Sequence, residues 1–175
     1  GFADTSTIRA APCSSRWLRE GPGGPGAGRP TLVWRTVVLQ EAAEEQGLLG
    51  SAGYAEHPLY PLARTVAVLN LDALNVHGRT RDLTIIGLGL SDLDQTIGAA
   101  AAAQGRVVRP DPMPEKGSYF RSDHFPFARK GVPSIHAGGG IEFVGKPADY
   151  GTRVLQEYIR NDYHEPSDAV KPDWD

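Results

Sequence analysis

The chain has 175 residues, 40% of them hydrophobic, which is enough for one folded domain with a core. Its net charge of -3 provides no basic stripe for a phosphate backbone, so we expect no nucleic-acid partner. No apolar run approaches the roughly 20 residues that span a bilayer. The single cysteine, Cys13, excludes an internal disulfide and a cysteine-built zinc site, so a metal would need His, Asp and Glu as ligands.

The N-terminal part of the chain has an unusual composition. Residues 21–30, GPGGPGAGRP, are almost entirely Gly and Pro, which disfavour both helices and strands. We therefore predict an irregular or disordered segment over residues 1–31, with the ordered domain covering residues 32–175. The first element of that domain is the apolar run 32–39, LVWRTVVL, which is typical of a strand buried in a parallel sheet.

Further along, strands and helices alternate. We predict strands at 65–72, 83–90, 106–112 and 132–138, helices at 46–57 and 91–105, a turn or short helix at 122–131, and an amphipathic helix followed by a loop at 149–164. Ser91 is the expected N-cap of the second helix, and Gly105 ends it. This alternation predicts an α/β sandwich with a largely parallel sheet.

Acidic residues and a histidine occur where such a sheet usually binds ligands, beyond the carboxyl ends of its strands. Glu44 and Glu45 follow one predicted strand, Asp72 ends the next, and His164 lies in the loop after the last helix. Carboxylates and imidazole are zinc ligands, and a cation would cancel the repulsion between the adjacent glutamates. Because successive side chains point in different directions, one glutamate could bind metal while its neighbour acts as a general base.

Four blocks in this order carry a resemblance to a known family: TVVLQEAAEEQGLLGS, VLNLDAL, YFRSDHFPFARKGVPSIH and NDYHEPSD. Over about residues 32–175 the chain resembles the M28 family of zinc aminopeptidases. The resemblance implies a zinc-exopeptidase fold of the phosphorylase/hydrolase-like type, a three-layer sandwich in which helices flank a mostly parallel mixed sheet. It also implies two zinc ions in the intact family site, a peptide substrate, and a secreted or periplasmic location.

The resemblance assigns roles to individual residues. Glu44 would be the general base, Glu45 a ligand of one zinc with His164 as its partner, and Asp72 a ligand of the other zinc. Tyr119, three residues before the Ser-Asp-His block, matches a tyrosine that lines the family's substrate pocket and can hydrogen-bond the developing oxyanion.

Two family ligands belong upstream of these blocks. The family's His-x-Asp histidine would precede the first residue of this chain. The bridging aspartate would correspond to Asp4, although the neighbouring residues 5–7 do not complete the family's usual run. We therefore expect an N-terminally truncated site that holds one zinc ion or none, and we hypothesise an altered reading frame ahead of residue 32.

Other interpretations stay open at this point. Taken alone, the paired glutamates could be solvated acids that favour the positive end of a helix. Ser122, Asp123 and His124 do not form a catalytic triad, because adjacent residues cannot supply its geometry and no G-x-S-x-G motif is present. We expect Asp123 and His124 to fix the loop that carries Tyr119.

Two other functions remain as alternatives to the aminopeptidase. One is a glutaminyl cyclase-like transferase, whose single zinc is held by Asp, Glu and His in relatives of this fold. The other is a non-catalytic fragment or interaction domain. The sequence does not indicate an oligomeric state.

Overall fold

The computed structural model describes residues 10–12, 36–39, 43–72, 75–172 and 174. The chain divides into two compact units, residues 1–42 and 43–175. In the first unit, β1 (Ala10–Pro12) pairs antiparallel with β2 (Val37–Leu39). β1 lies in the segment that we expected to be irregular.

The predicted place of the run 32–39 in a buried parallel sheet is wrong for its described part. The backbone hydrogen bonds of β2 go to β1 in a two-stranded antiparallel sheet, and Val38 is 51% exposed. Residues 32–35 lie outside the described part of the chain.

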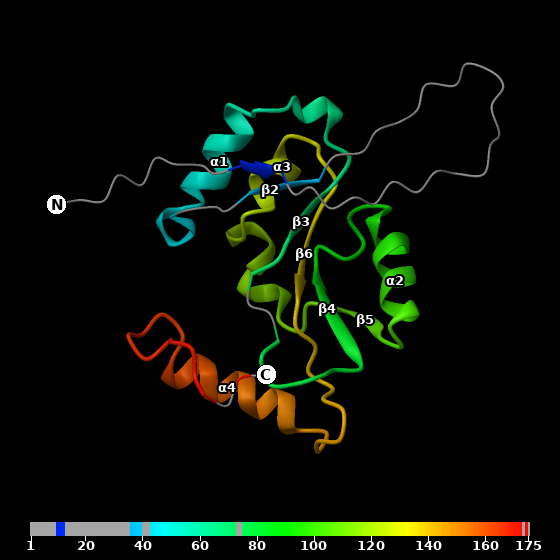
Figure 1. The fold of residues 1–175 in the computed structure, drawn as a ribbon, viewed down its shortest axis with the longest axis vertical. Coiled ribbons are helices and arrows are strands. Elements are labelled where there is room, and N and C mark those ends of the chain that lie inside the picture. Colours follow the sequence, from blue (N-terminus) through cyan, green and yellow to red (C-terminus); the bar gives the residue numbers. More distant parts are fainter. Residues whose placement is uncertain (1–9, 13–35, 40–42, 73–74, 173, 175) are drawn as a thin grey trace. The chain divides into compact units, whose positions relative to one another are not determined.

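The second unit contains a mixed sheet of four strands (Figure 1). Its strands are β3 (Val68–Asn70), β4 (Asp82–Ile86), β5 (Val107–Pro110) and β6 (Ser134–Gly138), in the spatial order β3-β6-β4-β5. β3 is parallel to β6 and β4 is parallel to β5, whereas β4 and β6 are antiparallel. A mostly parallel mixed sheet is therefore confirmed.

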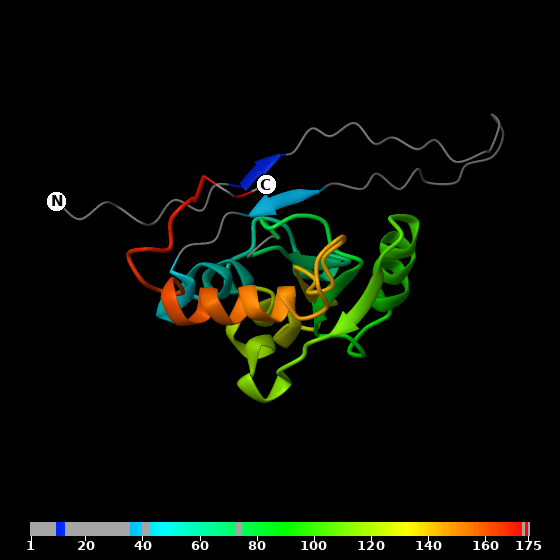
Figure 2. The same cartoon turned by 90° about the horizontal axis from the view of Figure 1, so that it is seen from below.

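Helices flank this sheet. They are α1 (Leu49–Glu56), α2 (Leu93–Ala103), α3 (Phe125–Arg129) and α4 (Tyr150–Asn161). α2 packs beside β5, α3 packs beside β6, and α1 packs on α3. Figures 1 and 2 both show α1 and α2 on opposite sides of the sheet. The α/β architecture that the sequence predicts is therefore confirmed.

The start of α2 differs from the prediction. Asp92, rather than Ser91, is the residue before the helix, and its side chain makes no capping hydrogen bond. The Ser91 hydroxyl is buried without a partner among the described residues. The Asp94 carboxylate instead accepts a hydrogen bond from the Gly89 N–H at 2.7 Å, so an acid inside the first turn ties the preceding loop to the helix. The predicted N-cap role of Ser91 is therefore wrong.

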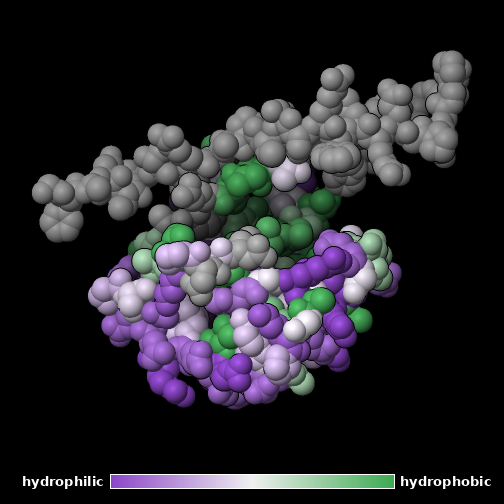
Figure 3. Space-filling model, turned by 60° about the horizontal axis from the view of Figure 1, so that its bottom comes forward, coloured by the Kyte–Doolittle hydropathy of each residue, from purple (hydrophilic) through white to green (hydrophobic). Residues whose placement is uncertain are grey.

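The core of the second unit lies between the central strands and α2. Ile85, Ile135 and Ala137 are buried, and the side chains that pack against them are Leu83, Leu88, Leu93, Ile97 and Val108. Burying each isoleucine stabilises the fold by about 1.5–3 kcal/mol. Figure 3 shows that hydrophilic residues cover most of the lower part of that view. None of the helices in the described ranges is long and apolar enough to cross a membrane.

Candidate metal and catalytic site

The paired glutamates lie in a strained turn. They begin a 3-10 helix, Glu44–Gln46, and the residues on either side of this turn, Ala43 and Leu48, have left-handed backbone φ angles of 58° and 61°. A non-glycine residue in this region costs about 1–2 kcal/mol. Of the described residues, one further non-glycine residue has a positive φ, His164 at 62°. Such strain persists only where the surrounding structure enforces it, and here it falls on segments that carry predicted site residues.

The delayed start of α1 follows from this turn. The predicted helix 46–57 begins at Leu49, because Gly47 and Leu48 both have positive φ and interrupt the helical backbone. Leu48 is buried, which anchors the end of the turn.

The charges around Glu44 identify its neighbours. Burial raises the pKa of Glu44, and the negative charges of Asp123, Asp72 and Glu45 raise it further, while His164 opposes the rise. Three of these four groups are predicted ligands, so the fold brings the predicted base and the ligands Glu45, Asp72 and His164 into one electrostatic environment. A raised pKa makes a carboxylate a better proton acceptor near neutral pH.

The charge of Asp72 affects several groups of this region. Asp72 follows β3 and is exposed. Its charge also contributes to the pKa shifts of His136 on β6 and Tyr158 on α4. The charge of Asp72 therefore acts on groups in the strained turn, in β6 and in α4.

The loop that carries His164 is tied back to α4. Three hydrogen bonds fasten it: Tyr158 to Asp168 at 2.8 Å, Lys171 to Asp162 at 2.5 Å, and Ser167 to the Asn161 carbonyl at 2.9 Å. The His164 ring packs on Tyr163, with 4.0 Å between the ring centroids. His164 itself has a left-handed backbone, and the loop that carries it is thus fastened on both sides of this residue.

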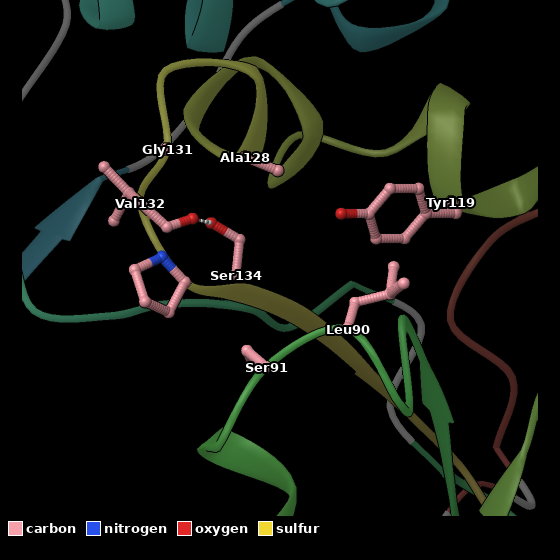
Figure 4. A pocket seen from close by; sticks show the side chains of 8 residues that line it. Leu90, Ser91, Tyr119, Ala128, Gly131, Val132 and Ser134 are labelled. Carbon is pink, nitrogen blue, oxygen red and sulfur yellow. Dashed lines mark hydrogen bonds between the residues drawn. The ribbon is translucent and has the colours of Figure 1, made fainter.

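Tyr119 lies in a different environment from Glu44. Its hydroxyl points into a cavity of about 210 Å³ (Figure 4), which is lined by Leu90, Ser91, Tyr119, Ala128, Gly131, Val132, Pro133 and Ser134. Burial raises the pKa of Tyr119. Its ring lies against Gly87, where an added Cβ would be 2.9 Å from Tyr119 Cε2. No described contact joins Tyr119 to Glu44, so its substrate-binding role stays a prediction.

Asp123 is a neighbour of Glu44 that sequence reasoning placed only in a structural loop. Its carboxylate accepts a 2.6 Å hydrogen bond from Ser51 in α1, 72 residues away. His124, next to it, is fully buried and packs edge-on against Tyr119 with ring centroids 4.9 Å apart. These contacts agree with a role in fixing the Tyr119 loop. No spacing in the sequence connects Asp123 with Ser51, so this pairing could not be read from it.

The donor chemistry of Glu45, Asp72 and His164 suits zinc, which binds carboxylate oxygen and imidazole nitrogen. Within the described part of the chain, however, no three His, Cys, Asp or Glu side chains are grouped closely enough to hold a metal ion. Asp4 lies outside the described residues. The fold thus places these ligands in one region without assembling a finished coordination shell.

Comparison with known families defines the class of protein. Residues 31–175 match the family model Peptidase_M28, which describes peptidase family M28. The chain belongs to this peptidase family. No curated protein sequence matches it.

Two solved structures are similar to this chain. An aminopeptidase from Aneurinibacillus sp. strain AM-1 has a TM-score of 0.42 and 23% identity, covering 65% of this chain and 26% of that one. BSAP, a zinc aminopeptidase from Bacillus subtilis, has a TM-score of 0.46 and 22% identity, covering 78% of this chain and 38% of its own. The chain therefore spans well under half the length of either protein.

Proposed function

We propose that this chain carries the general base and part of the metal site of a zinc-dependent aminopeptidase, which hydrolyses the N-terminal residue from peptides. The observation that carries the proposal is the environment of Glu44, where burial and the charges of Asp123, Asp72 and Glu45 raise the pKa and His164 lowers it. Membership of peptidase family M28 supports the same reaction class. By the same family likeness, we propose a secreted or periplasmic location.

The side chains have separate tasks in this proposal. Glu45 and His164 would hold one zinc ion and Asp72 the other, with Asp4 as the bridging ligand. Zinc, when bound, supplies Lewis-acid polarisation of the peptide carbonyl and lowers the pKa of water. Glu44 takes a proton from the attacking water and passes it to the leaving amine.

A tyrosine hydroxyl can complete this chemistry. Tyr119 would donate a hydrogen bond to the oxyanion of the tetrahedral intermediate, which stabilises the charge that develops there. This role requires the Tyr119 loop to approach the peptide when the substrate is bound.

A second candidate, single-zinc glutaminyl cyclisation, is favoured by the donor types of the three predicted ligands. Glu45, Asp72 and His164 provide one Glu, one Asp and one His, which is enough for one zinc ion but not for two. In that case the chain would cyclise N-terminal glutamine rather than cleave a peptide bond.

Zinc content and two substrates separate these functions. The purified chain is dialysed with Zn²⁺, its bound metal is counted, and it is assayed with a leucine anilide and with a peptide that begins with glutamine. Anilide cleavage supports the aminopeptidase, whereas one bound ion and cyclisation support the alternative. No bound zinc and no turnover with either substrate would reject both and leave a non-catalytic domain.

The variant Glu44→Gln tests the assigned base. It should bind zinc as the wild type does and lose at least about 100-fold in turnover, because amide nitrogen cannot accept the proton. Retained turnover would reject Glu44 as the base.

A further inference from the structure

A buried hydrogen bond connects the strained glutamate turn with a distant segment. Ser51 is fully buried in α1, and its hydroxyl donates to Asp123 Oδ1 at 2.6 Å. The same hydroxyl lies 3.2 Å from the carbonyl of Leu48, the left-handed residue that ends the turn. Because the shorter contact is to a carboxylate, the hydroxyl proton belongs to the bond with Asp123.

Among the described residues, the hydrogen bonds that begin and end within the turn are joined by the burial of Leu48 and by contacts of α1 with the segment around α3. The internal bonds of the turn are local, from the Gly47 and Leu48 N–H groups to the Glu44 carbonyl at 3.0 Å each. α1 and α3 also meet through the Tyr54 and Phe127 rings, at a centroid distance of 5.8 Å. Ser51 is closer to the turn in sequence than Tyr54 is. Of these two contacts, the Ser51–Asp123 hydrogen bond therefore acts nearer to the paired glutamates than the Tyr54–Phe127 contact does.

We propose that the Ser51–Asp123 hydrogen bond holds the turn of residues 43–48 in its strained conformation and thereby positions Glu44 and Glu45. Ser51 and Asp123 are then positioning residues, since they act through the turn rather than on the substrate. An effect of this bond on catalysis rests on the proposed function, whereas its effect on the conformation of the turn does not.

Two variants separate the bond from the charge of Asp123. Ser51→Ala removes the donor and keeps the carboxylate. Asp123→Asn removes the charge and keeps an oxygen that can accept the bond. If the bond positions the turn, Ser51→Ala should disturb the conformation of residues 43–48 more than Asp123→Asn does.

Amide hydrogen exchange and Zn²⁺ titration measure the effect. In Ser51→Ala we expect the amides of residues 44–50 to exchange about tenfold faster or more, while those of β4 and β6 keep their rates. The dissociation constant for Zn²⁺ should rise by about tenfold, as is typical when the groups behind metal ligands are lost. Asp123→Asn should change both quantities less.

The exposed ion pair between Lys130 and Glu56 provides a matched control. Lys130 directly follows α3, whereas Asp123 precedes it, and the 2.7 Å pair reaches Glu56 at the end of α1 away from the turn. Lys130→Ala should leave the exchange of residues 44–50 and the Zn²⁺ affinity at wild-type values.

Three results would overturn the inference: wild-type exchange at residues 44–50 in Ser51→Ala, faster exchange by the same factor throughout the unit, or a larger effect in Asp123→Asn than in Ser51→Ala. If the wild-type chain binds no Zn²⁺, the proposed function fails, and the exchange comparison still decides whether the bond holds the turn.

Discussion

Gly140 lies directly against Asp82, so that a Cβ atom at residue 140 would overlap both the carboxylate and the backbone carbonyl of Asp82. The Asp82 carboxylate is buried and accepts hydrogen bonds from the backbone N–H groups of Ile141 and Glu142, at 3.1 Å and 2.9 Å. The first turn of α4 packs on the same loop, since a Cβ at Gly151 would overlap the Ile141 carbonyl. This junction joins the start of β4 to the helix before the His164 loop.

Gly140→Ala should destabilise the fold by about 1–3 kcal/mol, because its methyl group meets backbone that cannot move aside. Urea unfolding followed by circular dichroism measures the loss. Gly98→Ala in α2 is the control, since nothing lies within 4 Å of its added Cβ, and helix propensity predicts a gain of up to about 1 kcal/mol. Equal stability of the two variants would contradict the packing argument.

Asp82→Asn should lower the free energy of unfolding by about 1–3 kcal/mol. The amide group has only one oxygen to offer two backbone donors, and its NH₂ would face an N–H group in a buried site. The same urea experiment measures this change. Glu157→Gln, an amide substitution at an exposed position of α4, should leave stability within about 0.5 kcal/mol of the wild type.

Acid should destabilise the fold through His124. Burial, with the charge of His136 as the smaller cause, lowers the pKa of His124 from 6.5 to about 4. The His124 imidazole therefore binds a proton more readily in the unfolded chain than in the folded one. The stabilisation that neutral His124 contributes is complete above pH 6.5 and is lost as the pH falls toward 4.

The aromatic variant His124→Phe, which cannot take up a proton, isolates this effect. Between pH 7 and pH 4 its free energy of unfolding should fall less steeply than that of the wild type. Parallel curves for His124→Phe and the wild type would reject His124 as the source.

Alkaline pH should loosen the attachment of the His164 loop. Burial, and then the hydrogen bond to Asp168, raises the pKa of Tyr158 from 10.0 to about 12. The contribution of Tyr158 is complete below pH 10 and is lost as the pH rises through about 12, because the phenolate cannot donate the bond. Ultraviolet titration of the tyrosines should lose its step near pH 12 in Tyr158→Phe. In Asp168→Asn the step should move to lower pH, and an unchanged titration curve in either variant would contradict the assignment.

The hydrophobic pattern of the sequence located most elements of the second unit. The runs at 65–72 and 83–90 contain β3 and most of β4, because β-branched and apolar residues cluster where strands are buried. The positions of Glu44, Glu45 and Asp72 after predicted strands also indicated one shared region, and the environment of Glu44 agrees with this.

The remaining features depend on tertiary structure that short-range patterns do not encode. Ala43 and Leu48 adopt left-handed conformations without the glycine that usually signals them, so Gly47 alone marked the late start of α1 in the sequence. The bond of Ser51 to Asp123 and the contact of Gly140 with Asp82 join residues far apart in the chain. The pairing of β2 with β1 likewise depends on a partner that the apolar pattern of residues 32–39 cannot specify.

The strand order has a consequence for how the sheet assembles during synthesis. β6 is the last of the four strands to leave the ribosome, yet it lies between β3 and β4 and is bonded to both. In the described sheet β3 has no neighbour other than β6, so a nascent chain that ends before Ser134 presents β3 as an unsatisfied edge. Chaperone contacts should therefore persist until residue 138 has emerged, and translational pausing before that point should promote aggregation.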